Sequence, residues 1–490
     1  MDLLQLAVFG AFALLYVFAL PRTWRAWALM IASVLALYWL QPTLNVRWLD
    51  YSLPTLLLGI TVGSWWLSRP DATPATRQDG LALTVVVGLA LALTIARYVD
   101  LPPALQLTSR PPEALGVVLA IVLAFGISAT VWRVVARTPQ GKARLISVAL
   151  LALVGVFVVV KTEAFAVPLA GFLRGQAGND PSLASLRDLE WLGFSYVAFR
   201  LIATLRDRQT GMLPAVSLRD YVVYLVFFPS ITAGPIARIE AENSFLQDVE
   251  RLNDLNGRDA QRLTEGLTRI VVGVFKKFVI ADSLALFALS AQNAEQAQGT
   301  GALWVMLYGY ALRLFFDFSG YTDIAIGLAW LLGIRLPENF DRPYLKHNIA
   351  LFWQSWHKSL SDWVRFYVYS PLSRSLLRRK PKPSTEAITL ICNLATMGII
   401  GLWHGVTLPF LVWGVWHGLG LWVHKLWSDR TRKWYMSLKD KPRQKLAWTL
   451  TGWALTFHFV VLGWVWFAMP EIGLALRVFF NLFGLGWNGS

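Results

Sequence analysis

The sequence has few charged residues and almost no cysteine for its length. Only 15% of its 490 residues are Asp, Glu, Lys or Arg, whereas 56% are hydrophobic and the mean hydropathy is +0.48. Soluble domains carry about a quarter charged residues, so an ordinary soluble protein is excluded. The single cysteine, Cys392, lies in an apolar run, which excludes an intramolecular disulfide and a cysteine-based metal cluster.

Several functional motifs are also missing. The sequence contains no Walker lysine loop, no dinucleotide fingerprint and no internal repeat of the kind that secondary transporters carry. The net charge of +15 is typical of nucleic-acid binding, but the basic residues stand in short loops between apolar runs. The preference for positive residues in cytoplasmic loops of membrane proteins explains that placement better.

Long apolar runs recur along the chain, as in residues 3–20, 26–40, 81–96, 115–131 and 145–160. Several approach the roughly 20 residues that a membrane-spanning helix needs. The pattern predicts an all-α polytopic membrane protein with about 11 to 14 membrane helices, re-entrant segments included. The first run lacks the basic start of a signal peptide, so we expect it to remain as a helix.

The two parts of the chain differ in how many polar and ionisable residues stand inside their apolar runs. Residues 1–135 hold hardly any ionisable residue inside an apolar run, which predicts N-terminal transmembrane scaffold helices. Residues 136–490 are predicted to form the functional core, since polar and aromatic residues interleave there within apolar segments such as "RLFFDFSGYTDIAIGLAW". Ionisable groups inside a membrane are expensive and usually serve a cavity.

Two basic loops orient the C-terminal region. They are residues 373–384 and 424–445, and short basic loops favour the cytoplasm. The residues between them suffice for two membrane passes. The turn "GLWHGVTLPF" between those passes is therefore expected to face outward, which places His404 at or below the outer surface.

Six histidines require an explanation, because imidazole in hydrocarbon needs a partner or a wet cavity. Spacing favours interfacial roles for His347 and His424 and helix packing for His458 and His417. His404 is either a general base for a hydroxyl or a structural residue.

The stretch "FWQSWHKSLSDWVRFYVY" contains a second candidate. If residues 350–370 form one helix, His357 shares a face with Trp353 and Leu360, while Lys358 and Asp362 lie on another. On spacing alone, this helix is either an interfacial helix with an aromatic belt or the lining of a site.

The stretches "RLFFDFSGYTDIAIGLAW", "FWQSWHKSLSDWVRFYVY" and "GLWHGVTLPF", in this order, resemble the bacterial branch of the membrane-bound O-acyltransferase (MBOAT) family, the branch of alginate O-acetylation and teichoic acid D-alanyl transfer. The resemblance covers about residues 145–470. It implies that His404 is the essential active-site histidine and His357 the second histidine. The candidates for substrate contact are Asp317, Tyr321, Asp323, Asn339, Asp362 and Trp403, and no metal is implied. The first four either line the chamber or serve as helix caps and partners of buried backbone groups.

The sequence departs from this pattern in two places: at an acidic position, and at a glycine pair of alginate-type members, where this chain has "SRSLLRRK". Many relatives carry an acidic residue where this chain has Phe366, and Asp362, four residues earlier on the same helical face, is the candidate to replace it. The stretch "WHGVT" is closer to the D-alanyl branch.

The resemblance implies a membrane-embedded O-acyltransferase in the bacterial plasma membrane. It would bind no cofactor and would use an acyl thioester, acetyl-CoA or a carrier-protein thioester, as its donor. The expected partners are membrane lipid, a cell-surface polysaccharide acceptor and an extracytoplasmic acyl-accepting protein. Acetyl is the expected group and D-alanyl the alternative. A transporter or a scaffold of a glycan-synthesis complex would share the composition.

Overall fold

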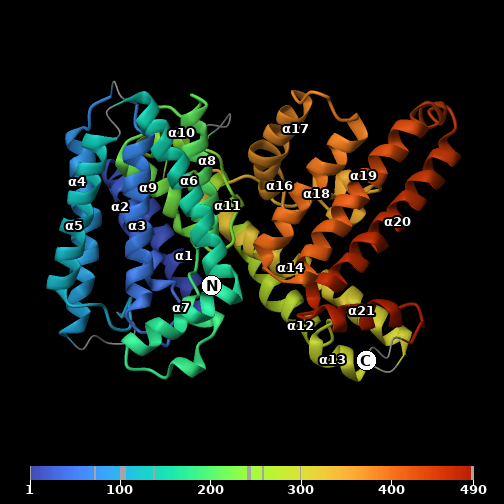
Figure 1. The fold of residues 1–490 in the computed structure, drawn as a ribbon, viewed down its shortest axis with the longest axis horizontal. Helices are drawn as coiled ribbons and strands as arrows, with labels where there is room; N and C mark the ends of the chain where they lie inside the picture. The colour runs from blue at the N-terminus through green and yellow to red at the C-terminus, as the bar shows by residue number, and fades with distance from the viewer. Residues whose placement is uncertain are drawn as a thin grey trace. The chain divides into compact units, whose positions relative to one another are not determined.

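The computed structural model describes residues 2–70, 73–99, 106–135, 138–239, 244–256, 259–297 and 299–486. Within these ranges the chain is helical and has no β-strand, and one isolated bridge pairs Phe340 with Trp356. The predicted all-α class is confirmed. Figure 1 shows the elements in chain order.

Five described helical segments are long and apolar enough to cross a membrane. They are Arg77–Arg97, Ala114–Val134, Pro139–Lys161, Thr385–His404 and Pro442–Ala468. Two shorter apolar helices, Leu3–Phe18 and Ile472–Asn481, accompany them. Several crossing segments in one chain make it a multi-pass membrane protein. The predicted total of 11 to 14 membrane helices stays a prediction.

The chain forms two units. The first comprises Met1–Thr268 and Ala325–Leu336, and the second comprises Arg269–Ile324 and Pro337–Ser490. This division reflects which residues contact one another. The predicted boundary between residues 135 and 136 separates scaffold helices from a functional core, and it stays a prediction.

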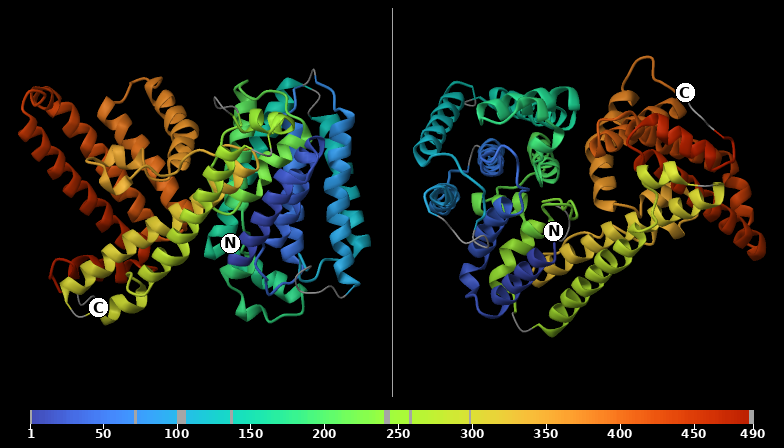
Figure 2. Two further views of the ribbon diagram at one scale, coloured as in Figure 1. Left: turned by 180° about the vertical axis from the view of Figure 1, so that it is seen from behind. Right: turned by 90° about the horizontal axis from the view of Figure 1, so that it is seen from below.

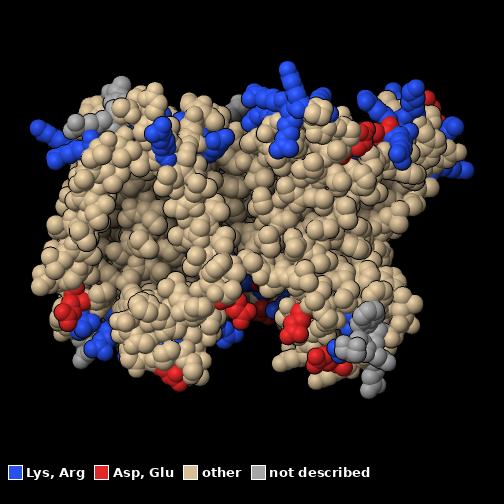
Figure 3. Space-filling model, viewed as in Figure 1, with Lys and Arg blue, Asp and Glu red and all other residues tan. Residues whose placement is uncertain are grey.

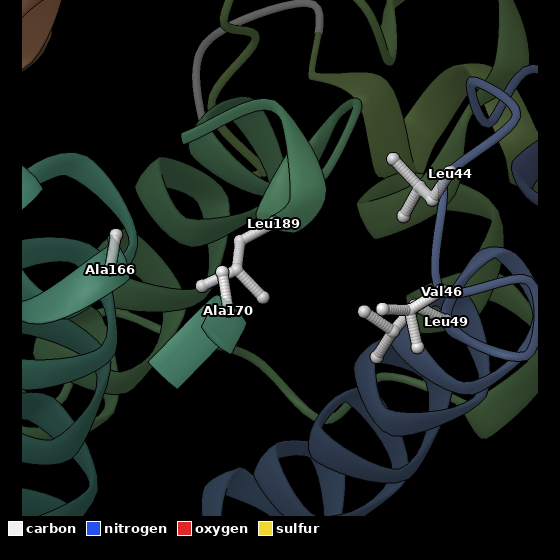
Figure 4. Packing of buried hydrophobic residues seen from close by; sticks show 6 residues of the cluster. All are labelled: Leu44, Val46, Leu49, Ala166, Ala170 and Leu189. Carbon is white, nitrogen blue, oxygen red and sulfur yellow. The ribbon is translucent and has the colours of Figure 1, made fainter. Parts of the chain in front are cut away.

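The first unit contains the helices from the N-terminal part of the chain. They are α1 (Leu3–Phe18), α2 (Arg25–Trp39), α3 (Leu49–Ser68), α4 (Arg77–Leu93), α5 (Ala114–Val134), α6 (Pro139–Lys161), α7 (Glu163–Gln176), α8 (Phe194–Gln209), α9 (Leu218–Val226), α10 (Phe245–Glu250) and most of α11 (Ala260–Val274). Figure 4 shows one of its apolar clusters, in which side chains from the start of α3, from α7 and from the turn at Leu189 face one another.

The second unit contains the helices that carry the predicted site. They are a π-helical turn (Phe275–Ala281), α12 (Asp282–Ala285), α13 (Ala291–Gln296), most of α14 (Thr300–Leu331), α15 (Ile349–Trp353), α16 (Lys358–Val364), a second π-helical turn (Arg365–Tyr369), α17 (Ser370–Leu377), α18 (Thr385–His404), α19 (Leu408–Ser437), α20 (Pro442–Ala468) and α21 (Ile472–Asn481). In the views of Figure 2, α18, α19 and α20 lie side by side, consistent with their contacts.

The helix pair α18–α19 confirms the predicted turn, because α18 ends at His404 and α19 begins at Leu408. Glycines allow the two helices to touch closely. A Cβ added at Gly401 would lie 2.3 Å from the carbonyl oxygen of Phe410, and one at Gly414 would lie 2.5 Å from that of Met397. Small residues at a helix crossing are typical of membrane proteins.

Residues 350–370 do not form one continuous helix, so the condition for a shared face of Trp353, His357 and Leu360 is not met. Helix α15 ends at Trp353, and α16 begins only at Lys358. Between them His357 adopts a left-handed backbone conformation with φ 44° and ψ 54°, which an α-helix cannot contain. Trp353 and His357 therefore do not belong to one helical face.

Candidate active site

His404 lies at the C-terminal end of α18 within a group of aromatic rings. The centroid of its imidazole is 4.5 Å from that of Trp403, 4.7 Å from that of Phe467 and 5.8 Å from that of Trp413. Phe467 belongs to α20 and Trp413 to α19, so all three helices of this group position the ring. The residue remains partly exposed. Such a ring is held in place and is still accessible to a substrate.

His357 is 3% exposed and lies at the junction between α15 and α16. Its imidazole meets the ring of Phe318 edge to face at a centroid distance of 4.7 Å. Its Nε2 atom forms no hydrogen bond to another described residue. A buried polar atom without a protein partner costs about 1–3 kcal/mol, so a ligand that satisfies it would gain that energy.

Trp403 connects the two histidines. Its ring centroid lies 6.2 Å from that of His357 and 4.5 Å from that of His404. The structure thus brings together three of the residues predicted from the sequence, although they lie nearly fifty positions apart along the chain. An indole that contacts both imidazoles favours a shared site over two separate packing roles.

Asn339 holds the backbone next to His357. Its Oδ1 atom accepts hydrogen bonds from the Ser359 amide at 3.2 Å and the Ser359 hydroxyl at 2.6 Å, and its carbonyl oxygen accepts one from the Lys358 amide at 3.0 Å. The neighbouring bridge between Phe340 and Trp356 fixes the other side of His357. Asn339 is fully buried, so we interpret it as a brace of the histidine segment.

The predicted acidic residues of α14 belong to ion pairs. Asp323 accepts from Arg269 Nε at 2.9 Å and from Lys276 Nζ at 2.6 Å, while Asp317 pairs with Lys277. A close crossing makes these pairs possible, because a Cβ added at Gly320 would lie 2.8 Å from the carbonyl oxygen of Gly273. The third predicted residue of α14, Tyr321, is buried.

Asp362 lines a cavity of about 400 Å³. Lys358 and Arg365 contribute its charged side chains, and Met397 and Ile400 of α18 contribute apolar surface. The whole lining is Ala350, Trp353, Gln354, Lys358, Ser361, Asp362, Val364, Arg365, Tyr369, Asn393, Thr396, Met397, Ile400 and Leu421. His357 and His404 are not in this lining, but Lys358 directly follows His357 and Ile400 lies four residues before His404.

The other histidines have distinct surroundings. His458 bonds the hydroxyl of Tyr308 through Nε2 at 3.0 Å and the carbonyl oxygen of Ala454 through Nδ1 at 2.8 Å, as expected of a packing residue. His417 is fully buried against Trp353 and Trp413, and neither of its ring nitrogens bonds another described residue, so its packing role stays a prediction.

Sequence reasoning missed two parts of this arrangement. Phe318 and Phe467 were not singled out, although both stand in aromatic runs, because an aromatic spacing alone does not show which ring meets a histidine. Arg269 and Lys276 were missed because their partner, Asp323, lies about fifty residues away.

The described residues hold no group of three His, Cys, Asp or Glu that could bind a metal ion.

A family model described as "MBOAT, membrane-bound O-acyltransferase family" matches residues 128–464, more than half of the chain. The matched segment includes both histidines and Trp403. The chain belongs to the membrane-bound O-acyltransferase family.

Three relatives illustrate which MBOAT proteins this chain is similar to. It is 35% identical to a protein named "Probable alginate O-acetylase" of Pseudomonas syringae pv. tomato, over 61% of this chain and 53% of that protein. It is 32% identical to the "Teichoic acid D-alanyltransferase" of Streptococcus thermophilus, over 57% of this chain and 68% of that protein. It is 34% identical to the "Peptidoglycan O-acetyltransferase" of Helicobacter pylori, over 54% of this chain and 47% of that protein. The chain spans about half the length of the first of these relatives.

Proposed function

We propose that this protein is a membrane-embedded O-acyltransferase that moves an acyl group, acetyl, from a thioester donor toward a hydroxyl of a cell-surface polysaccharide outside the cytoplasm of a bacterium. The observation that carries the proposal is that His357 and His404 both contact the ring of Trp403. Family membership and the names of the relatives support acyl transfer as the reaction class.

The chemistry assigns a role to each histidine. The acceptor hydroxyl attacks the thioester carbonyl carbon while His404, as general base, takes the hydroxyl proton. The carbonyl oxygen then carries negative charge, and His357 Nε2, which has no hydrogen-bond partner among the described residues, donates to it. The tetrahedral intermediate collapses, the carbon–sulfur bond breaks, and the proton on His404 passes to the leaving thiolate.

The cavity beside α16 supports a thioester as donor. Lys358 and Arg365 offer positive charge, while Met397 and Ile400 offer an apolar wall. A donor with a phosphate-bearing headgroup and a long uncharged arm matches this combination, because phosphate prefers cations and the arm prefers apolar surface. Acetyl-CoA and a carrier-protein thioester share that chemistry.

Charge on the second unit supports the proposed orientation. Figure 3 shows Lys and Arg gathered over α17 and over the turn between α19 and α20. Short basic loops prefer the cytoplasm, so the α18–α19 turn with His404 faces outward and the donor approaches from inside. An acceptor on the outer side fits a polysaccharide, or an extracytoplasmic protein that carries the acyl group onward.

A second candidate function is D-alanyl transfer to a teichoic-acid-like polymer. The similarity to the Streptococcus thermophilus protein, of which this chain covers 68%, favours it specifically. Both candidates need the same two histidines and differ in the acyl group.

The direct test is thioester turnover by the purified protein in lipid nanodiscs. We expect free thiol to appear with acetyl-CoA or an acetylated carrier protein when a hydroxylated acceptor is present, and His404→Ala to abolish its release. Turnover with only a D-alanyl carrier thioester would select the second candidate. Equal turnover by wild type and His404→Ala would overturn the proposal.

A further inference from the structure

Helices α19 and α20 meet in a strongly cationic turn. The chain between residues 425 and 445 contains eight Lys or Arg side chains and two acids, which leaves a net charge of +6. We refer to these residues as the hairpin tip, and Figure 3 shows Lys and Arg gathered over it. All of them belong to the second unit. A charge of this size on so short a segment favours an anionic partner.

The cations of the hairpin tip have few protein partners. Lys425 pairs with Asp429 at 2.6 Å, and Glu386 at the start of α18 interacts electrostatically with Arg430. The other six cations form no salt bridge with a described residue, and all six are exposed: Arg432, Lys433, Lys439, Lys441, Arg443 and Lys445. One acid, Asp440, stands among these six, so most of their charge is not neutralised by the protein.

Helix lengths place the start of the tip at the edge of the hydrocarbon layer. At 1.5 Å per residue, α19 is about 29 Å long from Leu408 to Trp427, and α20 is about 30 Å long from Trp448 to Ala468. The hydrocarbon core of a bilayer is about 30 Å thick. The rings of Trp427 and Trp448 stack at a centroid distance of 6.2 Å, so both helices reach this edge at the same level. Residues beyond them lie among the lipid headgroups or in water.

The indole groups of α19 show the same boundary. Trp416 and Trp422 each donate a hydrogen bond from Nε1 to a backbone carbonyl oxygen, at 3.0 and 3.1 Å. Trp427 and Trp434 form no hydrogen bond with a described residue, and they are 52% and 47% exposed. An indole N–H inside hydrocarbon needs a protein acceptor, whereas one at the membrane surface can donate to a lipid headgroup. The change occurs between Trp422 and Trp427, as the helix lengths require.

The hairpin tip combines its cations with exposed aromatic and apolar side chains. Tyr435 is 38% exposed and Met436 is 67% exposed, and both follow Trp434 directly. Exposed Trp and Tyr beside Lys and Arg are typical of a segment that lies in the interface of a membrane. Headgroups surround this level of the helices, and a soluble acidic protein would have to displace them. Charge and position together therefore favour anionic lipid over a protein partner.

We infer that the hairpin tip binds anionic phospholipid headgroups of the leaflet that it faces. Phosphate oxygens accept charge-assisted hydrogen bonds from the Lys and Arg side chains. The indole N–H groups of Trp427 and Trp434 donate to the headgroup region, and their rings pack on the upper part of the acyl chains. This inference does not depend on the proposed acyl transfer.

The test measures lipid binding by the purified full chain in detergent micelles. Native mass spectrometry follows titration with dioleoylphosphatidylglycerol, which is anionic, or with dioleoylphosphatidylcholine, which is zwitterionic. The first variant combines Arg432→Gln, Lys433→Gln and Lys439→Gln, and the second combines Lys441→Gln and Arg443→Gln. The matched control removes the same charge as the first variant from three exposed arginines of the first unit: Arg47→Gln, Arg110→Gln and Arg187→Gln.

We expect phosphatidylglycerol to bind the wild type at least about tenfold more tightly than phosphatidylcholine. Each surface cation contributes about fivefold to anionic lipid binding, so the first variant should weaken phosphatidylglycerol binding by about tenfold to a hundredfold. The second variant, with two changes, should weaken it less, and the control should bind as the wild type does. Raising the salt concentration from about 0.1 M to about 0.5 M should weaken the binding of phosphatidylglycerol more than that of phosphatidylcholine.

A change at the indoles separates charge from anchoring. The double change Trp427→Leu with Trp434→Leu should weaken the binding of both lipids by similar factors, since interfacial tryptophan serves headgroups of either charge. Thermal unfolding of each variant shows which of them are folded, and the lipid preference is compared among those.

Equal binding of the two lipids by the wild type would overturn the inference. An unchanged preference in a folded cation variant, or a loss in the control as large as in the first variant, would also overturn it. Polyglutamate serves as an acidic polypeptide probe in the same titration. If polyglutamate displaces bound phosphatidylglycerol from the wild type but not from the control lipid phosphatidylcholine, the hairpin tip is a protein-docking surface instead.

Discussion

At the scale of single residues, His357 combines burial, a left-handed backbone and an Nε2 atom without a protein partner. The surrounding contacts must stabilise this arrangement, since the conformation is costly by itself. Asn339 on one side and the Phe340–Trp356 bridge on the other supply them. A catalytic donor held in this way needs no rearrangement when the oxyanion forms.

The first prediction concerns the oxyanion donor. His357→Gly accepts the left-handed backbone but lacks the imidazole, so we expect kcat for thioester turnover to fall by about 10²-fold or more. His424→Gln, a change at a histidine outside the site, should leave kcat near the wild-type value. A turnover of His357→Gly close to wild type would contradict the assignment.

The second prediction concerns the brace. Asn339→Leu leaves the buried Ser359 hydroxyl and amide without their acceptor, at a cost of about 1–3 kcal/mol, and releases the segment of His357. We expect kcat to fall while KM for the acceptor is unchanged, and Asn339→Asp, which keeps an acceptor oxygen, to recover part of kcat. A rise in KM with constant kcat would instead show that Asn339 binds the acceptor.

At the scale of elements, the α18–α19 pair positions His404 through close glycine contacts. Gly414 faces the backbone of α18, where a Cβ would lie 2.5 Å from the carbonyl oxygen of Met397 and 3.0 Å from Cα of Gly398. Backbone atoms cannot move aside as a flexible side chain can. The spacing of the two helices, and with it the position of His404, therefore depends on this glycine.

The third prediction follows from that contact. Gly414→Ala should force the helices apart, destabilise the protein by about 1–3 kcal/mol and reduce turnover. Gly398→Ala is the control, because an added Cβ at Gly398 meets nothing within 4 Å. Thermal unfolding and turnover of both variants in the same nanodiscs would check it. Equal melting temperatures for the two variants would contradict the argument.

The elements also show what a sequence can predict. Apolar runs and basic loops correctly predicted the α18–α19 turn and His404 at the end of a helix, because these follow from local hydropathy. The break at His357 was not predicted, since Trp353, His357 and Leu360 have helical spacing, whereas contacts from Asn339 and Phe340, which lie earlier in the chain, stabilise the interruption. The ion pairs of Asp323 join distant segments, which periodicity cannot reveal.

At the scale of the whole molecule, stability depends on buried polar networks as well as on apolar surface. In the first unit, Arg174 bonds Asp188 through two nitrogens at 2.9 Å each, and Asn45 donates to the same carboxylate at 2.7 Å. Burial raises the pKa of Asp188, but the hydrogen bonds from Arg174 and Asn45 outweigh it and lower the pKa to about 2.

The fourth prediction is the pH dependence of that network. A carboxyl with a pKa of about 2 in the fold and about 3.9 unfolded stabilises the fold above pH 4, and this stabilisation is lost as the pH falls toward 2. Asp188→Asn should thus lower the free energy of unfolding by about 3 kcal/mol at neutral pH. The difference in unfolding free energy between this variant and the wild type should become smaller below pH 4. Glu113→Gln, in the exposed pair with Arg97, should cost little.

Thermal unfolding between pH 3 and pH 7 measures both variants. A difference between wild type and Asp188→Asn that stays constant down to pH 3 would show that the ion pair does not stabilise the fold. If Glu113→Gln lowered the thermal stability as much as Asp188→Asn does, burial would not explain the contribution of the Asp188 ion pair.

The most direct test of the account is mass spectrometry of cell-surface glycan from cells that carry the wild type, a deletion or His404→Ala, with the amount of the variant in the membrane measured in parallel. The account predicts that one ester disappears in both the deletion and the variant, and the lost mass identifies acetyl or D-alanyl. If His404→Ala accumulates normally and keeps every ester that the deletion loses, His404 is not the catalytic base.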